Sequence, residues 1–173
     1  MSFNGLAQYV SYLESHGDLC RVKCRVNPIL EIAEIADRMV KNGGKALLFE
    51  DTGTPFPLLI NAFASDERMA AAISRKSLQD AGEEILSLSE AMSGAHRLTA
   101  RLARLPRMLS YLKLAPHRRR GRGECQEVVE PVTDLDILPV LKCWPHDGGR
   151  YITLPLVHTR HPLTGKTNLG MYR

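Results

Sequence analysis

The fold of the second half of this chain is predicted from its final stretch, Asn168-Leu169-Gly170-Met171-Tyr172-Arg173. Alternation along it predicts a strand whose odd-numbered residues, Arg173 included, share one face, while its even-numbered residues, Asn168 included, share the other. A second strand is predicted over residues 151–159, and a loop with Pro162 and Gly165 joins the two. Because no turn closes the last strand, we interpret the sequence as the N-terminal part of a longer protein.

Arg173 ends an apolar strand face and therefore requires an anion. One interpretation is a salt bridge, or a side chain that extends from the sheet edge into water. From the strand pattern alone, this is the plainer interpretation.

Length and composition set broad limits. The chain has 173 residues, of which 44% are hydrophobic, enough for one domain or two small ones with a buried core. No run of 18 apolar residues occurs, and the N-terminus lacks the basic and apolar regions of a signal peptide, so a cytoplasmic location is expected. The four cysteines show no CxxC spacing, which is typical of reduced thiols.

The first part of the sequence predicts a small mixed α/β domain over residues 1–115. Alternation over residues 20–26 predicts a strand that places Cys20 and Cys24 on one buried face. Ser65 and Ser77 are the expected N-caps of the helices that follow. The remaining predicted elements are a helix near residues 6–13 that ends at Gly17, a helix that opens at Asn27-Pro28 and ends at Gly43-Gly44, and strands at residues 46–49 and 58–60.

The positive charge of the chain is concentrated in one segment. Residues 91–123 contain no acid and nine of the 23 lysines and arginines, so the rest of the chain carries 14 basic against 19 acidic residues. Within residues 97–122, leucines recur between the arginines at helical spacing, as in a helix that binds anionic lipid. Nucleic acid is a poorer match, because Tyr111 is the only aromatic residue there. A solvated helix face and a basic linker is the plainer interpretation.

Several weaker patterns are discounted. The triplet Gly165-Lys166-Thr167 lacks the upstream glycine of a phosphate-binding loop and predicts a turn. His158 and His161 would point to opposite faces of a regular strand and could not share a metal. Cys143 and His146 have proline between them and no signature of a catalytic pair, so a packed cysteine is the better interpretation.

Taken together, the motifs of the second half resemble the UbiD-type decarboxylases, the polyprenyl-hydroxybenzoate carboxy-lyase family, in residue types and spacing. Residues 30–38 and 46–50 fit the N-terminal region of that family, whereas residues 65–130 match it only loosely. The motifs that carry the resemblance are Leu138-Pro139, Trp144-Pro145, Asp147-Gly148-Gly149, Ile152-Thr153 and the final stretch from Asn168 to Arg173.

The resemblance implies an α+β fold in which residues 116–173 form a linker and the opening strands of a split β-barrel flavin-binding domain. It also implies prenylated FMN as cofactor, with a divalent metal, Mn²⁺ or Mg²⁺, and K⁺ as a further candidate ion. By the same likeness, Arg173 is the catalytic residue: it lies beside the reactive ring and orients the substrate carboxylate, which its planar fork can hold through two hydrogen bonds. Asn168 binds the metal, and Thr153, Leu169 and Met171 contact the cofactor.

The implied reaction is the reversible, non-oxidative decarboxylation of an aromatic or α,β-unsaturated carboxylic acid, in which a cofactor must take up the electrons left when carbon dioxide departs. The implied partners are that small acid and further copies of the same chain, with contact to a membrane surface where the substrate is polyprenylated. The family's catalytic glutamates and remaining metal ligands lie downstream of the Asn168 motif, so we expect the 173-residue sequence to be inactive by itself. The competing hypothesis is a non-enzymatic binding module that uses residues 97–122.

Overall fold

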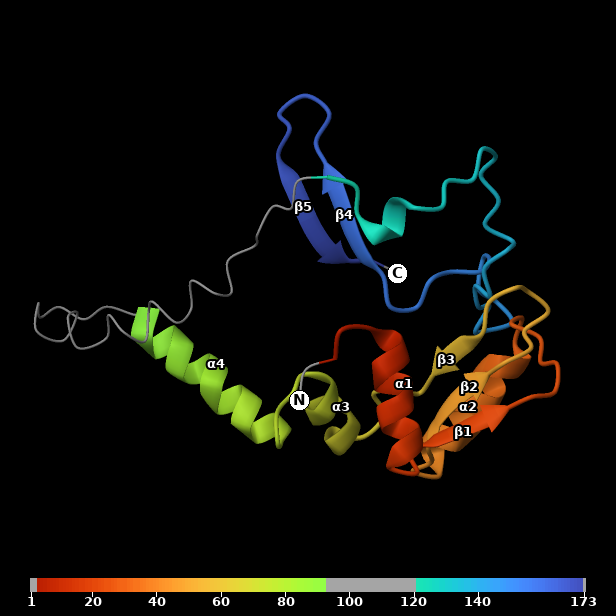
Figure 1. Ribbon diagram of the computed structural model, residues 1–173, viewed down its shortest axis with the longest axis horizontal. Helices are drawn as coiled ribbons and strands as arrows, with labels where there is room; N and C mark the ends of the chain where they lie inside the picture. The colour runs from red at the N-terminus through yellow and green to blue at the C-terminus, as the bar shows by residue number, and fades with distance from the viewer. Residues whose placement is uncertain (1–2, 93–120, 173) are drawn as a thin grey trace, which may run out of the picture.

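The computed structural model describes residues 3–92 and 121–172 and shows a mixed α+β protein with two small sheets, as the sequence predicted. Figure 1 shows the elements in chain order. They are α1 (Leu6–Ser15), β1 (Leu19–Val22), α2 (Glu31–Lys41), β2 (Ala46–Phe49), β3 (Leu58–Ile60), α3 (Asp66–Ala72), α4 (Leu78–Met92), a single 3-10 turn (Glu124–Gln126), β4 (Leu156–Arg160) and β5 (Thr167–Met171).

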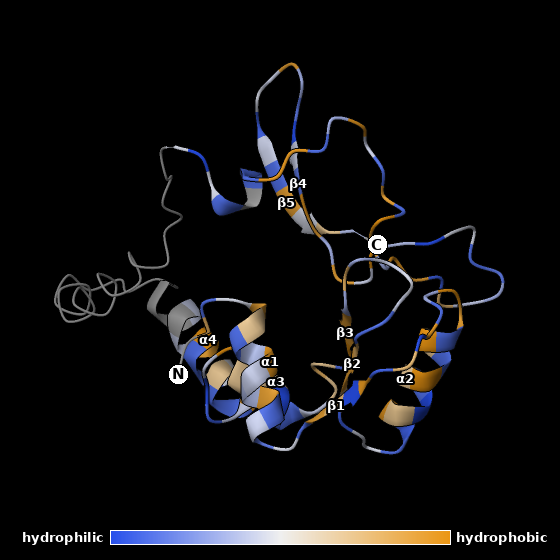
Figure 2. Ribbon diagram, turned by 45° about the vertical axis from the view of Figure 1, so that its right-hand side comes forward, coloured by the Kyte–Doolittle hydropathy of each residue, from blue (hydrophilic) through white to orange (hydrophobic). Residues whose placement is uncertain are grey.

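The first sheet has the order β1-β2-β3 and lies between two helical layers, with α1 and α3 on one side and α2 on the other (Figure 2). β1 and β2 are parallel, and α2 is the crossover that a parallel pair requires. β3 then pairs antiparallel with β2. Because β2 is covered on both faces, all of its residues are buried, which explains why its sequence is apolar throughout and does not alternate.

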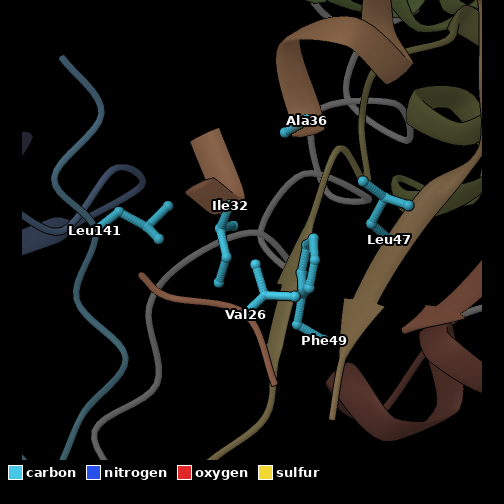
Figure 3. Close-up of a cluster of buried hydrophobic side chains, with 6 residues drawn as sticks. All are labelled: Val26, Ile32, Ala36, Leu47, Phe49 and Leu141. Carbon is cyan, nitrogen blue, oxygen red and sulfur yellow. The ribbon is translucent and has the colours of Figure 1, made fainter. Parts of the chain in front are cut away.

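The α2 face of the sheet carries the larger hydrophobic cluster, shown in Figure 3. Ile32 and Ala36 of α2 pack against Leu47 and Phe49 of β2. The cluster also contains Leu141, which is only 4% exposed although it lies far along the chain. The core of the first sheet is therefore completed by a residue from the second half of the sequence.

Backbone contacts hold the segment around Leu141 in place. Ile29 and Lys142 form a parallel bridge, and the N–H of Leu30 donates to the carbonyl of Lys142 at 2.9 Å. Leu141 also forms an antiparallel bridge with Tyr151. The proline- and glycine-rich composition after residue 123 had predicted β structure, but residues 121–150 are mostly turns and bends with these isolated bridges.

The opposite face of the sheet is covered by α1. Tyr9 and Leu13 are buried against Ala46, and partly buried side chains such as Phe3 and Leu59 pack around them. The hydroxyl of Tyr9 lies 3.0 Å from the carbonyl oxygens of both Ala62 and Arg68, to which it can donate. Burial raises the pKa of Tyr9 above its usual value, because the phenolate would lose its hydration there.

Most of the residues that were predicted to begin or end helices do so in the structure. The hydroxyl of Ser65 accepts a hydrogen bond from the N–H of Arg68 at 3.2 Å, and that of Ser77 accepts one from Asp80 at 3.1 Å. Gly17 follows α1 with a φ of 73° and Gly43 follows α2 with a φ of 60°, values that glycine adopts without strain. The helix α2 begins at Glu31 and so later than the predicted opening at Asn27-Pro28.

The strand predicted over residues 20–26 is shorter than expected. β1 ends at Val22, opposite Phe49, where its partner β2 also ends. Cys20 is therefore partly buried in the sheet, whereas Cys24 lies beyond it and is exposed. The prediction that both cysteines share one buried strand face was wrong, because an alternating sequence forms a strand only as far as a neighbour is present to pair with it.

Candidate functional site

The predicted site residues lie on and around a hairpin formed by β4 and β5. Its turn is organised by His161, whose ring Nδ1 accepts hydrogen bonds from the N–H groups of Leu163 and Thr164 at 3.2 Å each. Gly165 then takes a positive φ of 68°. The turn predicted around Gly165 is confirmed, and His161 serves the turn while His158 lies within β4.

The hairpin separates the predicted cofactor residues onto two faces. Leu169 and Met171 are directly opposite His158 and Leu156 on one face, while Asn168 and Gly170 belong to the other. Leu169 and Met171 are each 65% exposed. A ligand that contacts Asn168 together with Leu169 and Met171 must therefore reach both faces of the hairpin, around the edge of β5 that is turned away from β4.

Asn168 is held by Tyr172, the residue that directly follows β5. Its side-chain Nδ2 donates to the hydroxyl oxygen of Tyr172 at 3.2 Å. Its Oδ1 has no hydrogen-bond partner among the residues that the structure describes, and the side chain is exposed. An exposed amide oxygen of this kind is a suitable ligand for a hard divalent cation.

Thr153 lies apart from the hairpin. It was predicted within a strand over residues 151–159, but β4 begins at Leu156, and Thr153 lies in a bend before it. It lines a groove of about 270 Å³ between β3 and the segments 138–141 and 151–153. None of the predicted hairpin residues lines that groove, so the structure does not bring Thr153 together with Asn168.

Two other predictions fall on residues that the structure leaves undescribed. Arg173, the predicted catalytic residue, lies outside the described residues. The basic segment 97–122 lies outside them as well, except for its last two residues.

Gly170 and Tyr172 lie beside Asn168 in the structure but were not among the predicted site residues. The signal was present in the sequence, since the same alternation that places Asn168 on one face places residues 170 and 172 beside it. What the alternation could not show is that the Tyr172 side chain reaches back along the strand to Asn168.

A larger groove than the one beside Thr153 lies elsewhere. It has a volume of about 720 Å³ and runs between α2 and residues 143–145. Its walls are mainly apolar, and the carboxylates of Glu34 and Asp37 beside it are paired with Arg38 and Lys41. No predicted site residue lines it, so this groove is distinct from the hairpin site.

The described ranges contain no group of three or more histidine, cysteine, aspartate or glutamate side chains arranged to hold a metal. Within these ranges, Asn168 stays the metal ligand that the resemblance implied, without a three-residue cluster of these types. Over the same ranges, no helix has the length and apolar character needed to cross a bilayer.

Comparison with known families gives two matches in chain order. Residues 10–88 match the 3-octaprenyl-4-hydroxybenzoate carboxy-lyase N-terminal domain, and residues 117–173 match the Rift-related domain of the same carboxy-lyase, both under the family name UbiD. The second match contains every predicted site residue.

Curated relatives extend over the whole chain. An uncharacterised protein of Archaeoglobus fulgidus is 42% identical over 100% of this chain and 35% of its own length. One of Aquifex aeolicus is 37% identical over 99% of this chain and 36% of its own length. The chain thus spans about a third of the length of the curated relatives it matches.

Solved structures share the fold at low sequence identity. The closed form of vanillic acid decarboxylase from Sedimentibacter hydroxybenzoicus superposes with a TM-score of 0.70 at 23% identity, over 99% of this chain and 35% of that one. An evolved dimeric form of the UbiD-class enzyme HmfF from Pelotomaculum thermopropionicum, in complex with prFMN, gives a TM-score of 0.64 at 23% identity, over 98% of this chain and 35% of that one.

Proposed function

The chain belongs to the UbiD family of 3-octaprenyl-4-hydroxybenzoate carboxy-lyases, and from this membership we propose that it supplies the N-terminal domain and part of the cofactor-binding domain of a decarboxylase. The proposed reaction is the non-oxidative, reversible removal of carbon dioxide from an aromatic or α,β-unsaturated carboxylic acid. The likeness in fold to a vanillic acid decarboxylase and to an enzyme in complex with prFMN supports it.

The observation that carries the proposal is the exposed Oδ1 of Asn168 on β5, within the Rift-related match. A neutral amide oxygen can coordinate Mn²⁺ or Mg²⁺ without adding negative charge beside a phosphate. The residue present thus fits the proposed metal. In this interpretation, Asn168 holds the metal that retains the phosphate of a prenylated FMN, and residues 117–173 contribute to a split β-barrel around it.

The cofactor, when bound, supplies the electron sink that protein side chains lack. The residues of this chain bind and orient. Leu169 and Met171 offer an exposed apolar surface, and Thr153 offers a hydroxyl in a separate groove. Arg173 is assigned to the substrate carboxylate from its chemistry, because a guanidinium stays charged at any working pH and can hold a carboxylate through two hydrogen bonds.

Arg173→Lys tests the catalytic assignment in a family-length enzyme that carries this sequence. We expect flavin content to stay near normal and carbon dioxide release to fall by about a hundredfold or more, because lysine keeps the charge but loses the bidentate geometry. Arg160→Lys is the matched control, since it makes the same change at the far end of the hairpin. Near-normal turnover in Arg173→Lys would overturn the role given to Arg173.

Asn168→Ala tests the metal assignment in the same enzyme. We expect metal-dependent flavin retention to fall first, and activity to decrease in proportion to the flavin lost. Flavin absorbance per protein and carbon dioxide release, measured over a series of Mn²⁺ concentrations, separate the two effects. Full flavin retention with reduced turnover would place Asn168 in the chemistry and remove it from the metal site.

A further inference from the structure

Building on the proposed function of Asn168 as a metal ligand, we propose that Tyr172 is the positioning residue for that ligand. Its hydroxyl fixes the side-chain amide of Asn168 so that Oδ1 is presented to the metal. Gly170 lies between the two residues and leaves the space that the Tyr172 ring occupies.

The contact between Asn168 and Tyr172 is unusual for a strand. Residues four apart on a strand are separated by about 13 Å, since each residue adds about 3.3 Å. Strand side chains normally stand nearly perpendicular to the sheet. Here the Tyr172 side chain lies back along β5, and its hydroxyl oxygen reaches to 3.2 Å from Nδ2 of Asn168.

Gly170 is what allows the ring to take this position. A Cβ atom at residue 170 would lie 2.5 Å from Cε2 of Tyr172 and 3.0 Å from Cζ, closer than such atoms approach one another. Gly170 does not have a positive φ, so its backbone conformation is open to any residue. The glycine is therefore needed for space, and a larger residue would displace the ring.

The burial of the hairpin agrees with this arrangement. Val157 and Gly170 pair with each other across the hairpin, and they are the only partly buried residues of β4 and β5. The ring of Tyr172 lies over Gly170, on the same face as Asn168. The rest of the two strands is exposed.

The hydrogen bond determines which end of the amide is available. Nδ2 can only donate, and it donates to Tyr172, so Oδ1 keeps both of its lone pairs for another partner. A rotated amide would direct its N–H groups at a cation, which cannot accept them. Metal coordination by Oδ1 and the hydrogen bond to Tyr172 therefore favour the same orientation, and each strengthens the other.

The first test uses the 173-residue chain without metal. The side-chain amide resonances of Asn168 in a ¹⁵N–¹H correlation spectrum should shift in Tyr172→Phe, which removes only the hydroxyl, and in Gly170→Ala, which displaces the ring. Tyr12→Phe, a hydroxyl deletion on α1, should leave them unchanged. Asn168 amide resonances that are identical in all three variants would overturn the proposal, whatever the fate of the proposed function.

The second test measures Mn²⁺ affinity in a family-length enzyme that carries this sequence, by paramagnetic resonance of free Mn²⁺ in the presence of FMN. Tyr172→Phe and Gly170→Ala should each weaken affinity about tenfold, the size of effect expected from a residue that orients a metal ligand. The double variant should be no weaker than either single variant, since both remove one interaction. Asn168→Ala should be weaker than all three.

The results separate two kinds of failure. If Asn168→Ala weakens Mn²⁺ binding and Tyr172→Phe does not, Tyr172 has no positioning role and the metal assignment stands. If Asn168→Ala binds Mn²⁺ as tightly as the parent enzyme, the metal assignment itself is wrong. Fully additive losses in the double variant would show that Gly170 acts independently of Tyr172 and would also overturn the proposal.

Discussion

The two sheets of this molecule differ in composition and in environment. β2 is apolar, lies between α1 and α2 and is buried along its whole length, whereas β4 and β5 carry polar residues, pair with each other and with no other described strand, and remain largely exposed. Strand formation and strand burial are therefore separate events here. The first requires a neighbour with matching hydrogen bonds, and the second requires a layer on each face.

Substitutions in the two regions should affect different properties of the protein. Substitutions in the first sheet remove packed contacts and should act on stability. Substitutions on the hairpin remove little packing and should act on whatever binds there. Leu156, Leu169 and Met171 form a contiguous exposed apolar surface on one face, which is typical of a binding surface.

Phe49→Ala should give the largest loss of stability. Phe49 is fully buried between the sheet and α2, so its truncation should lower the free energy of unfolding by about 3–5 kcal/mol. Leu169→Ala, at an exposed hairpin position, should change it by less than about 0.5 kcal/mol. Urea denaturation followed by circular dichroism measures both, and equal losses would contradict the division between the two regions.

Leu141→Ala should give the next largest loss, about 2–4 kcal/mol, because Leu141 lies in the same cluster as Phe49. This result would show that the segment after residue 121 stabilises the first domain. Leu135→Ala is the matched control, since that side chain is 66% exposed. A change at Leu141 no larger than at Leu135 would mean that the segment does not dock in solution.

Tyr9→Phe should cost about 1 kcal/mol, the usual value of one buried hydrogen bond. The ring and its packing are retained, and only the hydroxyl that donates to Ala62 or Arg68 is lost. Tyr12→Phe should change the unfolding free energy by less than about half as much. A cost for Tyr12→Phe equal to that for Tyr9→Phe would mean that the buried hydrogen bonds contribute nothing specific.

Protonation of two exposed carboxylates should slightly lower the stability of the folded protein at acid pH. Hydrogen bonding from Arg21 holds the pKa of Glu14 below its usual value of 4.5, and a backbone hydrogen bond with help from Ser65 does the same for Glu67. Because both folded-state pKa values are lowered, their contribution is complete above pH 4.5 and is lost as the pH falls through them. Below pH 4.5, the unfolding midpoint of Glu14→Gln and of Glu67→Gln should therefore depend slightly less on pH than that of the unsubstituted protein. The same dependence on pH in all three proteins would contradict this prediction.

Local patterns predicted much of the first region. The apolar runs at β2 and β3 gave the observed bounds, and Ser65, Ser77, Gly17 and Gly43 act as expected. These features depend on residues that are close in sequence. The prediction that the first strand continues beyond Val22 was wrong because the end of this strand depends on where its partner β2 ends, and β2 is close in space but distant in sequence.

The hairpin that carries the predicted site residues was predicted from the sequence, whereas the roles of those residues stay predictions. The alternation around Asn168 predicted a hairpin and its two faces correctly, but the first strand begins at Leu156 and not at residue 151. The position of Thr153 in a separate groove could not be predicted, because it depends on how residues 138–153 return to β3. Arg173 stays a prediction.

By itself, the sequence determined the family, the identity of the helices and strands in the first domain, and the order of residues along each hairpin face. These follow from residue type and spacing, which act over a few neighbours. Only the tertiary structure decided that Leu141 completes a core built from residues about a hundred positions earlier, and that Tyr172 folds over Gly170 to hold Asn168. Both depend on close packing between specific atoms in space, which the order of residues constrains but does not specify.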